Sequence, residues 1–556
     1  MKKTFLLSCL MLAAMPVMAA YTGHVYVDKN KNGVFDQSEK PLAGIKVSDG
    51  LNVVETAADG SFTLPGHERE RFIFITTPSG YKTFNRHYHK IEKKQSGYDF
   101  DLIPYSGRIR KDGSHRYIHI TDTEIFNTEN HADWVNNVHD YARNEQAAFI
   151  IHTGDICYEK GLKAHIKLMN TENMDCPVFY CIGNHDLVKG KYGEELFESI
   201  YGPVYYSFDA GNVHYVVTPM PGGDHAPGYT SDDVCRWLKN DLTHIRPGTP
   251  VVVFNHDLLT YEDTFIFKSK NAGSINLNEY NLKAWVYGHW HINYMKKQGD
   301  VYSVCTSSLD KGGIDHSTTA FRVMHVDSKG DFTSELRYTY LDKNICIASP
   351  AGVMASGVLP VAVNVYSSVS PVREVLYTCL ADGKPVLKNK RLLQSTDWSW
   401  NGELPLSHKY VGKELTLRVT ARFNNGEIAE AESNFICRTE KTVPLFSADW
   451  DNLSGNAKHS APVSAPLNLP LQLAWTNNVG ANLYMTSPLI HKGKVIVASV
   501  DEDLKGAGHV YALNGKDGTI LWSCPVRNSI KNSIAVDSDI CLLYTSPSPR
   551  DKRQSR

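Results

Sequence analysis

Between residues 113 and 345, six short apolar runs each end in a cluster of polar residues, and segments 131–145, 192–202 and 231–245 between them have helical spacing. The runs are "RYIHIT", "AAFIIHTGD", "PVFYCIGNHD", "HYVVT", "TPVVVFNHD" and "KAWVYGHWH". Alternating strands and helices predict an α/β domain built in layers. In such a domain the carboxyl ends of the strands meet at one edge of the sheet, so we expect the polar clusters to gather there as a site.

The rest of the chain has a different pattern. A chain of 556 residues is too long for one hydrophobic core. Residues 21–105 and 346–445 alternate polar and apolar positions between turn residues, which predicts a β-sandwich on each side of the α/β domain. Residues 466–540 contain "VYALNGKDGTILW", which resembles the repeat of PQQ-type (quinoprotein-like) β-propellers. We therefore expect a multidomain protein that ends in a partial propeller of one blade and the start of another.

The two ends of the chain are interpreted as something other than folded domains. Residues 1–20 have two lysines, an apolar stretch and small residues, the pattern of a secretory signal peptide. We therefore expect export, to the periplasm, the cell surface or the medium. Residues 541–556 read as a translated sequencing adapter.

Composition limits the possible partners. The formal net charge is -2, and 21% of the residues are charged. A charge this small predicts no overall attraction to nucleic acid or to an anionic membrane. No later segment is long and apolar enough to predict a transmembrane helix.

A short loop in the first sandwich has oxygen-bearing residues at alternate positions around Gly33. The loop resembles the calcium loops of bacterial surface β-sandwich modules, which predicts a bound Ca²⁺ ion. The alternative is a solvated Asn/Asp turn. The predicted ligands are Asp28, Asn30, Asn32, Val34 through its backbone carbonyl, Asp36 and Glu39.

Five clusters of metal-binding residue types follow one another in the α/β domain. They are Asp122 with Glu124; Asp155; Asn184, His185 and Asp186; His256; and His289 with His291. Their order and spacing resemble the calcineurin-like metallophosphoesterases, with the motifs D-x-H, G-D, G-N-H-D/E, a lone H and G-H-x-H. The resemblance covers essentially all of residues 113–345. Any one motif alone is weak evidence, whereas the ordered set is specific.

The resemblance implies a centre of two divalent ions, Mn, Fe, Zn or Mg, and hydrolysis of a phosphomonoester or phosphodiester by metal-hydroxide attack. Asp155 would bridge the two ions, and His185 would transfer the proton to the leaving oxygen. The substrate would be a phosphorylated small molecule, glycan or lipid. The other ligands implied are Asp122, Glu124 and His291 at one ion, and Asn184, His256 and His289 at the other.

Two positions depart from the family pattern. Glu124 replaces the histidine of D-x-H; a carboxylate is still a metal ligand, but it lowers the net charge of the centre by one. Tyr158 stands where many relatives have an acid that orients the catalytic histidine, which puts the partner of His185 in doubt. We interpret the site as working but altered.

The loop 220–229, "MPGGDHAPGY", is rich in Gly and Pro and follows a predicted strand. Asp224, His225 and Tyr229 are candidate substrate contacts, and the alternative is a plain surface loop.

Two other functions stay open. A catalytically weak or inactive cell-surface binding protein would also use sandwiches and a propeller, and Glu124 would then mark the loss of activity. A quinoprotein dehydrogenase rests on the one propeller signature.

Overall fold

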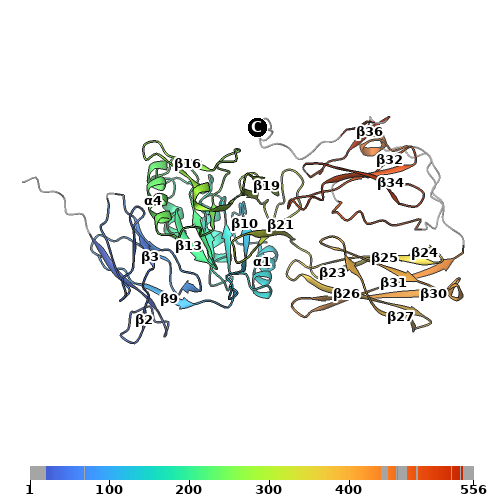
Figure 1. Ribbon diagram of the computed structural model, residues 1–556, viewed down its shortest axis with the longest axis horizontal. Helices are drawn as coiled ribbons and strands as arrows, with labels where there is room; N and C mark the ends of the chain where they lie inside the picture. Colours follow the sequence, from blue (N-terminus) through green and yellow to red (C-terminus); the bar gives the residue numbers. More distant parts are fainter. Residues whose placement is uncertain are drawn as a thin grey trace, which may run out of the picture.

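The computed structural model describes residues 20–542, apart from residues 68, 440–448, 457, 459, 461–472, 484–485, 528 and 539. The chain is a multidomain protein rich in β-strands with few helices. Figure 1 shows an N-terminal β unit at one end, the α/β domain in the centre and two β units at the other end. The predicted signal peptide, apart from Ala20, and residues 543–556 of the predicted adapter segment lie outside the described residues.

The N-terminal unit consists of two sheets packed face to face. Period-2 alternation places Val25, Phe62, Ile73 and Phe100 between the sheets, where they are buried. One sheet has the order β2-β1-β9-β7, with β5 paired to β1, and the other has the order β4-β3-β6-β8. The strands are β1 (Tyr21–Val27), β2 (Lys40–Pro41), β3 (Lys46–Ser48), β4 (Val53–Glu55), β5 (Ser61–Leu64), β6 (Phe72–Ile75), β7 (Tyr81–Thr83), β8 (Tyr88–Lys90) and β9 (Phe100–Pro104).

The first sheet of the α/β domain has the order β12-β11-β10-β21-β22. Strands β10, β11 and β12 are parallel neighbours, whereas β21 and β22 are antiparallel. The carboxyl ends of the three parallel strands therefore meet at one edge. The strands are β10 (His115–Ile120), β11 (Phe149–His152), β12 (Val178–Tyr180), β21 (Ala320–Val326) and β22 (Phe332–Tyr338).

The second sheet of this domain has the order β13-β14-β15-β18-β20-β19. Strands β14, β15, β18 and β20 run parallel. The strands are β13 (Tyr206–Ala210), β14 (Val213–Val217), β15 (Val251–Phe254), β18 (Leu282–Tyr287), β19 (Tyr294–Gln298) and β20 (Val301–Cys305). The hairpin β16 (Ile266–Lys268) and β17 (Ser274–Asn276) leads into the 3₁₀ helix η1 (Leu277–Tyr280).

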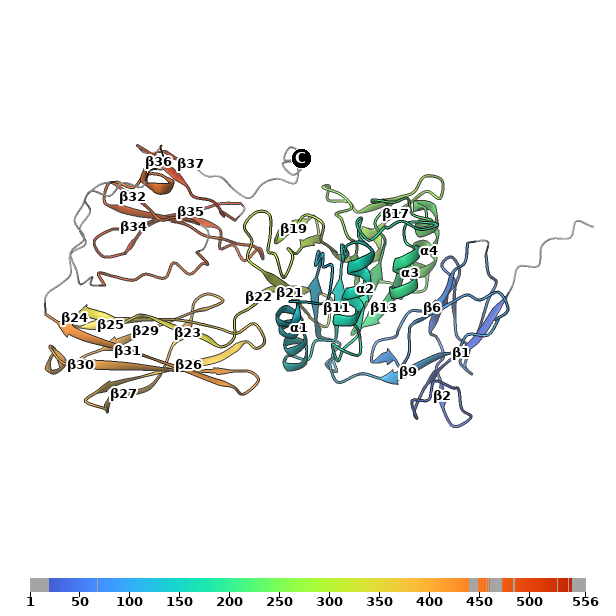
Figure 2. The ribbon, with the colours of Figure 1, turned by 180° about the vertical axis from the view of Figure 1, so that it is seen from behind.

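Alternation along the strands explains the layers. Tyr117 and Phe149 face the second sheet, where their rings stack 4.7 Å apart, and Ile118, Ile120 and Ile150 face the helices. Three helices, α1 (Ala132–Asn144), α2 (Tyr158–Leu168) and α3 (Glu195–Tyr201), pack on the first sheet, and α4 (Ser231–Thr243) packs on the second. The helix-sheet-sheet-helix arrangement is visible in Figure 2.

The second β-sandwich follows β22. Its sheets have the orders β23-β25-β29-β28 and β24-β31-β30-β26-β27. The elements are β23 (Asn344–Ser349), β24 (Gly352–Ala355), β25 (Val358–Tyr366), β26 (Val372–Ala381), β27 (Lys384–Arg391), β28 (Leu393–Gln394), β29 (Ser399–Pro405), β30 (Glu414–Phe423), β31 (Ile428–Arg438) and the 3₁₀ helix η2 (His408–Tyr410).

The last unit begins with the 3₁₀ helix η3 (Leu453–Gly455) and contains one four-stranded antiparallel sheet in sequential order. Its strands are β32 (Leu489–His491), β33 (Lys494–Ala498), β34 (His509–Asn514) and β35 (Ile520–Pro525), followed by the pair β36 (Ala535–Asp537) and β37 (Ile540–Leu542). Among the described residues these strands close no ring, so the partial propeller stays a prediction. No helix in the described part of the chain has the length and apolar character that crossing a membrane requires.

Candidate metal centre

The polar clusters follow the carboxyl ends of five parallel strands from both sheets. Asp122 follows β10, Asp155 follows β11 and Asn184 follows β12 in the first sheet. His256 follows β15, and His289 with His291 follows β18, in the second sheet. Because the two sheets pack face to face, their strand ends present these side chains to a common region.

Five of these residues have a left-handed backbone, which non-glycine residues rarely adopt. Their φ angles are 50° at Asp122, 44° at Glu124, 54° at Asp155, 63° at His289 and 51° at His291. Such a conformation costs about 1–3 kcal/mol per residue and persists only where the surrounding fold imposes it. These strained residues follow the ends of three strands, β10, β11 and β18, and all five are candidate ligands.

Glycines let the strand ends approach one another. A Cβ atom at Gly154 would lie 2.7 Å from His256 Nδ1, and one at Gly288 would lie 2.6 Å from Asp122 Oδ2. Both distances are too short for a carbon atom. The glycines of the G-D and G-H-x-H motifs are therefore required by close packing around the site.

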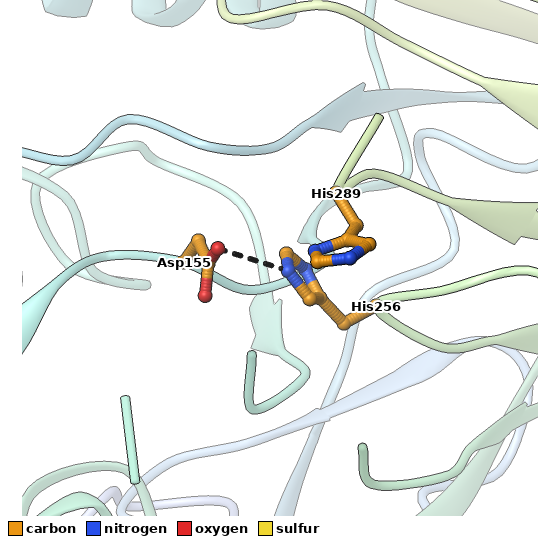
Figure 3. Close-up of side chains that lie close together, drawn as sticks. All are labelled: Asp155, His256 and His289. Atoms are coloured by element: carbon orange, nitrogen blue, oxygen red, sulfur yellow. Dashed lines mark ion pairs between the residues drawn. The ribbon is translucent and has the colours of Figure 1, made fainter. Parts of the chain in front are cut away.

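Asp155, His256 and His289 form the tightest cluster of the centre, with one candidate ligand atom of each within 4.8 Å of the others. His256 Nε2 lies 3.0 Å from Asp155 Oδ2. Figure 3 shows the Asp155 carboxylate facing the His256 ring, with His289 beside it. His256 Nδ1 donates to the backbone oxygen of Thr153 at 2.7 Å, which fixes the ring so that Nε2 faces the centre.

Asp122, Glu124 and His291 form a second cluster. His291 Nε2 lies 3.2 Å from Asp122 Oδ1 and 3.5 Å from Glu124 Oε1. The backbone N–H of Glu124 donates to Asp155 O at 3.1 Å, which joins the second cluster to the first. On the outer side, Lys311 Nζ lies 2.9 Å from Glu124 Oε2. Glu124 thus lies at the centre, between a histidine and a lysine.

Asn184 and His185 complete the edge of the first sheet. The backbone N–H of His185 donates to Asp155 Oδ1 at 3.0 Å, which holds this segment against the Asp155 cluster. His185 Nδ1 lies 2.8 Å from Asp224 Oδ2. A carboxylate only accepts hydrogen bonds, so Nδ1 carries the proton and Nε2 is the nitrogen free for proton transfer. Asp224 is thus the partner of His185 that the sequence, with Tyr158 in the usual acidic position, left in doubt.

The fit of a metal ion can be tested on buried atoms without partners. Asp122 Oδ1, Asn184 Oδ1 and His256 Nε2 are buried and make no hydrogen bond within the described part of the chain, although Asp122 and His256 each lie close to an oppositely charged group. For the Asn184 oxygen, which has no such charged neighbour among the ion pairs of the described residues, the lost hydrogen bond costs about 1–3 kcal/mol. Two oxygens and a nitrogen left in this way are the donor types that divalent ions take. The residues present fit a metal centre.

The electrostatics of the site favour a cation. Burial lowers the pKa of His256, but the attraction of Asp155 outweighs it and raises that pKa to about 10. Burial, followed by the charge of Asp155, raises the pKa of Asp186 to about 7. Both shifts show a concentration of negative charge in a region shielded from water. Asp186 accepts hydrogen bonds from the backbone N–H groups of Cys157 and Gly183, each at 2.9 Å, so it braces two of the strand ends.

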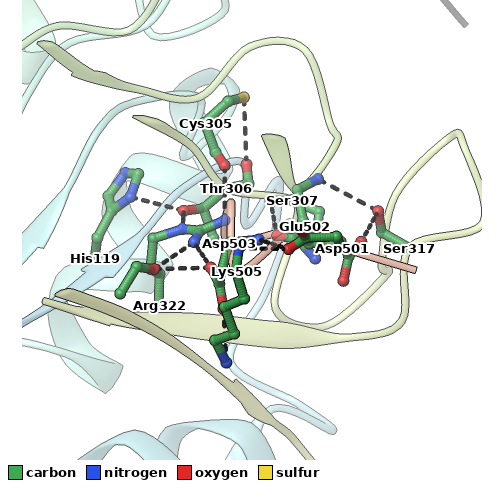
Figure 4. Close-up of polar contacts among 12 residues, drawn as sticks. His119, Cys305, Thr306, Ser307, Ser317, Arg322, Asp501, Glu502, Asp503 and Lys505 are labelled. Atoms are coloured by element: carbon green, nitrogen blue, oxygen red, sulfur yellow. Dashed lines mark hydrogen bonds and ion pairs between the residues drawn. The ribbon is translucent and has the colours of Figure 1, made fainter. Parts of the chain in front are cut away.

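A chain of hydrogen bonds leads from the last unit of the protein to the centre. Arg322, which is buried, pairs with Asp503 and donates from Nε to Thr306 Oγ1 at 3.1 Å (Figure 4). Thr306 Oγ1 lies 2.8 Å from His119 Nδ1, and His119 Nε2 lies 2.8 Å from Thr153 Oγ1. Burial lowers the pKa of His119 to about 3, so the ring is neutral and donates from one nitrogen only.

A second buried ion cluster joins the same two units. Lys531 Nζ lies 2.7 Å from Asp315 Oδ2 and 2.6 Å from Glu502 Oε1. Asp315 belongs to the loop between β20 and β21, which also carries Lys311. Removing one member of a buried pair leaves an uncompensated charge, which is strongly destabilising. The last unit is therefore docked firmly beside the loop that reaches Glu124.

The remaining predicted site residues lie elsewhere or play another part. Tyr229 is buried, donates to the backbone oxygen of Met220 and lines a cavity of about 600 Å³ beside Asn255 and Asp257. His225 is exposed on the loop. Of the three candidate substrate contacts, only Asp224 touches a residue of the predicted centre.

The predicted calcium loop lies between β1 and β2. Asp28 and Glu39 are buried, and Val34 has an exposed side chain. Asp36 Oδ2 accepts hydrogen bonds from the amides of Asn30 and Asn32, at 2.7 and 3.1 Å. Gly33 has a φ of 70° and donates to Asp28 Oδ2 at 2.9 Å, so the glycine makes the turn that folds the loop back on itself.

Sequence reasoning missed Lys311, His119 and Trp290 as parts of the site. Lys311 and Glu124 are 187 residues apart in the sequence, and no sequence pattern predicts a contact over that separation. Trp290 stands inside the G-H-x-H motif, and its indole nitrogen donates to Asp257 Oδ1 at 3.0 Å. That position between two histidines was a usable signal for a residue that holds the motif in place.

The fold and the site define a class: a layered α/β domain with a cluster of metal-ligand residues at the strand ends. Residues 115–293 match the family model of the calcineurin-like phosphoesterases, and residues 29–104 match the model of the N-terminal domain of that family. The chain therefore contains a calcineurin-like phosphoesterase domain preceded by that N-terminal domain.

Among characterised relatives, purple acid phosphatase 13 of Arabidopsis thaliana is 26% identical over 215 residues, which make up 36% of each chain. The alignment thus spans about a third of that relative. A solved structure from Streptococcus pneumoniae, described as a conserved uncharacterized protein and predicted phosphoesterase, is 10% identical and covers 41% of this chain and 98% of its own, at a TM-score of 0.19. A superposition at that score supports no statement about the site.

Proposed function

We propose that the chain is an exported, metal-dependent phosphoesterase with a working centre. The observation that carries the proposal is a group of three buried ligand atoms, on Asp122, Asn184 and His256, that make no hydrogen bond within the described part of the chain and come from strand ends of both sheets. The calcineurin-like phosphoesterase domain match supports the same activity. Export is supported by the signal-peptide pattern of residues 1–20, with the periplasm, the cell surface or the medium as destination.

Two divalent ions, Mn, Fe, Zn or Mg, would be held by Asp155 between them, by Asp122, Glu124 and His291 at one, and by Asn184, His256 and His289 at the other. Ions bound there supply Lewis-acid activation of water and neutralise the charge of the phosphoryl group. Three strand ends with imposed backbone geometry preorganise these ligands.

His185 would protonate the leaving oxygen from Nε2, since Nδ1 is committed to Asp224. The Asp224 carboxylate fixes the ring orientation and stabilises the protonated ring. The substrate would be a phosphomonoester or phosphodiester on a small molecule, a glycan or a lipid. The N-terminal loop from Asp28 to Glu39 would hold a calcium ion.

The test compares the wild-type chain with Glu124→Ala and, as a matched control, with Glu129→Ala, the same change at an exposed glutamate of the same loop. We expect the purified wild-type chain to contain close to two equivalents of divalent metal by elemental analysis and to hydrolyse an aryl phosphate. Glu124→Ala should lose metal and activity together, and Glu129→Ala should keep both. A wild-type chain that binds no metal and hydrolyses neither an aryl monoester nor a diester would identify a non-catalytic surface binding protein instead.

A further inference from the structure

Two aromatic side chains lie exposed beside the proposed proton donor. Phe126 is 57% exposed and Tyr158 is 42% exposed, and their rings stack with centroids 6.3 Å apart and planes 19° apart. The Tyr158 ring lies 5.4 Å from the His185 ring. Exposed apolar side chains that lie together, rather than singly, are typical of binding sites. The pair is called the aromatic platform below.

The backbone holds the platform in place at a cost. Cys157 and Tyr158 both have positive φ, 77° and 52°. Hydrogen bonds from Cys157 N to Asp186 Oδ1, at 2.9 Å, and from Tyr158 N to His185 O, at 3.1 Å, impose this conformation. Strain of this kind is stored where a side chain must point in a particular direction. Here it keeps the Tyr158 ring next to His185.

The position of His185 decides which part of a substrate meets the platform. In the proposed reaction the leaving oxygen takes its proton from His185, so the group attached to that oxygen must lie on the His185 side of the phosphorus atom. That side carries the Tyr158 ring and, stacked on it, Phe126. Flat rings stack on exposed aromatic faces with a substantial gain in affinity, whereas saturated groups gain less.

We propose that the aromatic platform of Phe126 and Tyr158 binds the leaving group, and that the preferred substrates are phosphoesters whose leaving group carries a flat aromatic ring. The assignment of the ring to the leaving group rests on the proposed function. The binding of the ring to the platform does not require turnover. An aryl ester and a nucleotide share this chemistry.

The first experiment measures ring binding without catalysis. The metal-free full chain is titrated with benzyl alcohol and with cyclohexylmethanol, a saturated partner of similar size, by saturation-transfer NMR. We expect benzyl alcohol to bind several-fold more tightly. Tyr158→Leu and Phe126→Leu keep apolar side chains but remove the rings, and each should abolish this preference. Phe84→Leu replaces an exposed aromatic side chain of the N-terminal unit and should leave the preference unchanged.

The second experiment uses the metal-loaded chain. Benzyl phosphate and cyclohexylmethyl phosphate have leaving alcohols of similar acidity. The ratio of their kcat/KM values therefore measures the preference for an aromatic over a saturated ring. We expect a ratio of roughly ten in the wild-type chain, which is about the value of one stacking contact, and a ratio near one in Tyr158→Leu. Comparison of adenosine 5′-phosphate with ribose 5-phosphate shows whether a nucleobase reaches the platform as well.

The two experiments distinguish a failure of the platform proposal from a failure of the phosphoesterase proposal. Hydrolysis of both esters at equal rates, with no ring preference in the metal-free chain, would overturn the platform and leave the phosphoesterase proposal standing. Ring binding that depends on Tyr158, in a chain that hydrolyses no ester, would support the platform and remove the phosphoesterase proposal.

Discussion

Lys311 Nζ lies 2.9 Å from Oε2 of Glu124 and 3.1 Å from its backbone oxygen. The substitution of the family's histidine by Glu124 adds one negative charge to the centre, and Lys311 returns one positive charge next to it. The pair Glu124–Lys311 therefore restores the formal charge balance that a histidine at position 124 would have given. The pair is partly exposed, and part of its charge is screened by solvent.

Lys311→Met should leave metal content unchanged or slightly higher and should reduce kcat/KM more for phosphomonoesters than for phosphodiesters. A monoester carries about two negative charges near neutral pH and a diester one, so the monoester loses more when a nearby cation is removed. The measurement is the kcat/KM for an aryl phosphomonoester divided by the kcat/KM for the matching aryl phosphodiester, with the same metal bound. Glu124→His makes the opposite change in charge and should raise that ratio. Equal ratios in all three proteins would show that this pair does not act through charge.

Asp155→Ala should lose both equivalents of metal, because Asp155 is the ligand proposed to lie between the two ions. We expect activity to fall on the order of a thousandfold or more, the effect of removing several kcal/mol of Lewis-acid stabilisation. Elemental analysis of the purified protein measures the metal, and a melting curve checks that it is folded. Retention of one full equivalent would show that the two ions do not share Asp155.

Asp224→Asn should lower kcat while metal content stays at the wild-type level. The amide cannot stabilise a protonated His185 as the carboxylate does, so we expect a loss of roughly tenfold or more, part of the 10²–10⁴ that a positioned general acid contributes as a whole. A substrate with a very acidic leaving group needs little protonation and should be affected least. Asp59→Asn, the same change at an exposed aspartate of the N-terminal unit, is the control. If the loss is the same for all leaving groups, Asp224 does not act through proton transfer.

His214 links β14 to α4 and makes part of the stability depend on pH. Its ring is buried between Asp209 Oδ1, at 2.7 Å, and Asp241 Oδ2, at 2.8 Å. Burial lowers the pKa of His214, but Asp241 and then Asp209 outweigh it and raise that pKa to about 9. The folded-state pKa lies above the unfolded value of about 6.5, so the stabilisation is complete below about pH 6.5 and is lost as the pH rises through 9.

The size of this contribution is on the order of 3 kcal/mol. Urea unfolding of the α/β domain between pH 6 and 9.5 should show this loss, and His214→Gln should remove the dependence over that interval. His408→Gln, at an exposed histidine of the second sandwich, should leave it unchanged. An identical pH dependence in wild type and His214→Gln would show that the histidine is not charged in the folded protein.

Calcium should stabilise the N-terminal unit by mass action on a site present only when that unit is folded. The gain is about 2.7 kcal/mol at a calcium concentration one hundred times the Kd. The Asp155→Ala chain is the suitable background, because the proposed metal centre should then contribute no ion binding. Glu39→Gln should weaken the effect by removing a carboxylate, and Glu92→Gln, an exposed acid of the same unit, should not. A melting temperature that does not respond to calcium identifies the loop as a solvated turn.

The sequence by itself determined the layered central domain and predicted the residues of its centre. Asp122, Asp155, Asn184 and His256 each follow a predicted strand closely in the sequence. A residue that directly follows a parallel strand must lie at the edge of the sheet, so local spacing alone predicts that these four residues gather there. The multidomain architecture was predicted from these patterns and is confirmed by the structure. The phosphoesterase domain was predicted from a resemblance to a known family, and residues 29–104 and 115–293 match the models of that family. Helix α2 was not predicted, although it begins directly after the Asp155 strand end.

Only the tertiary structure decided how the centre is completed. Asp224 reaches His185 across 39 residues, and Lys311 reaches Glu124 across 187. Both partners lie on loops, whose paths depend on how the two sheets pack and leave no periodic trace in the sequence. The exposure of Tyr158 likewise depends on backbone angles that Asp186 and His185 impose. Local spacing places residues at the ends of strands, whereas the contacts between loops from different sheets exist only after the layers have packed.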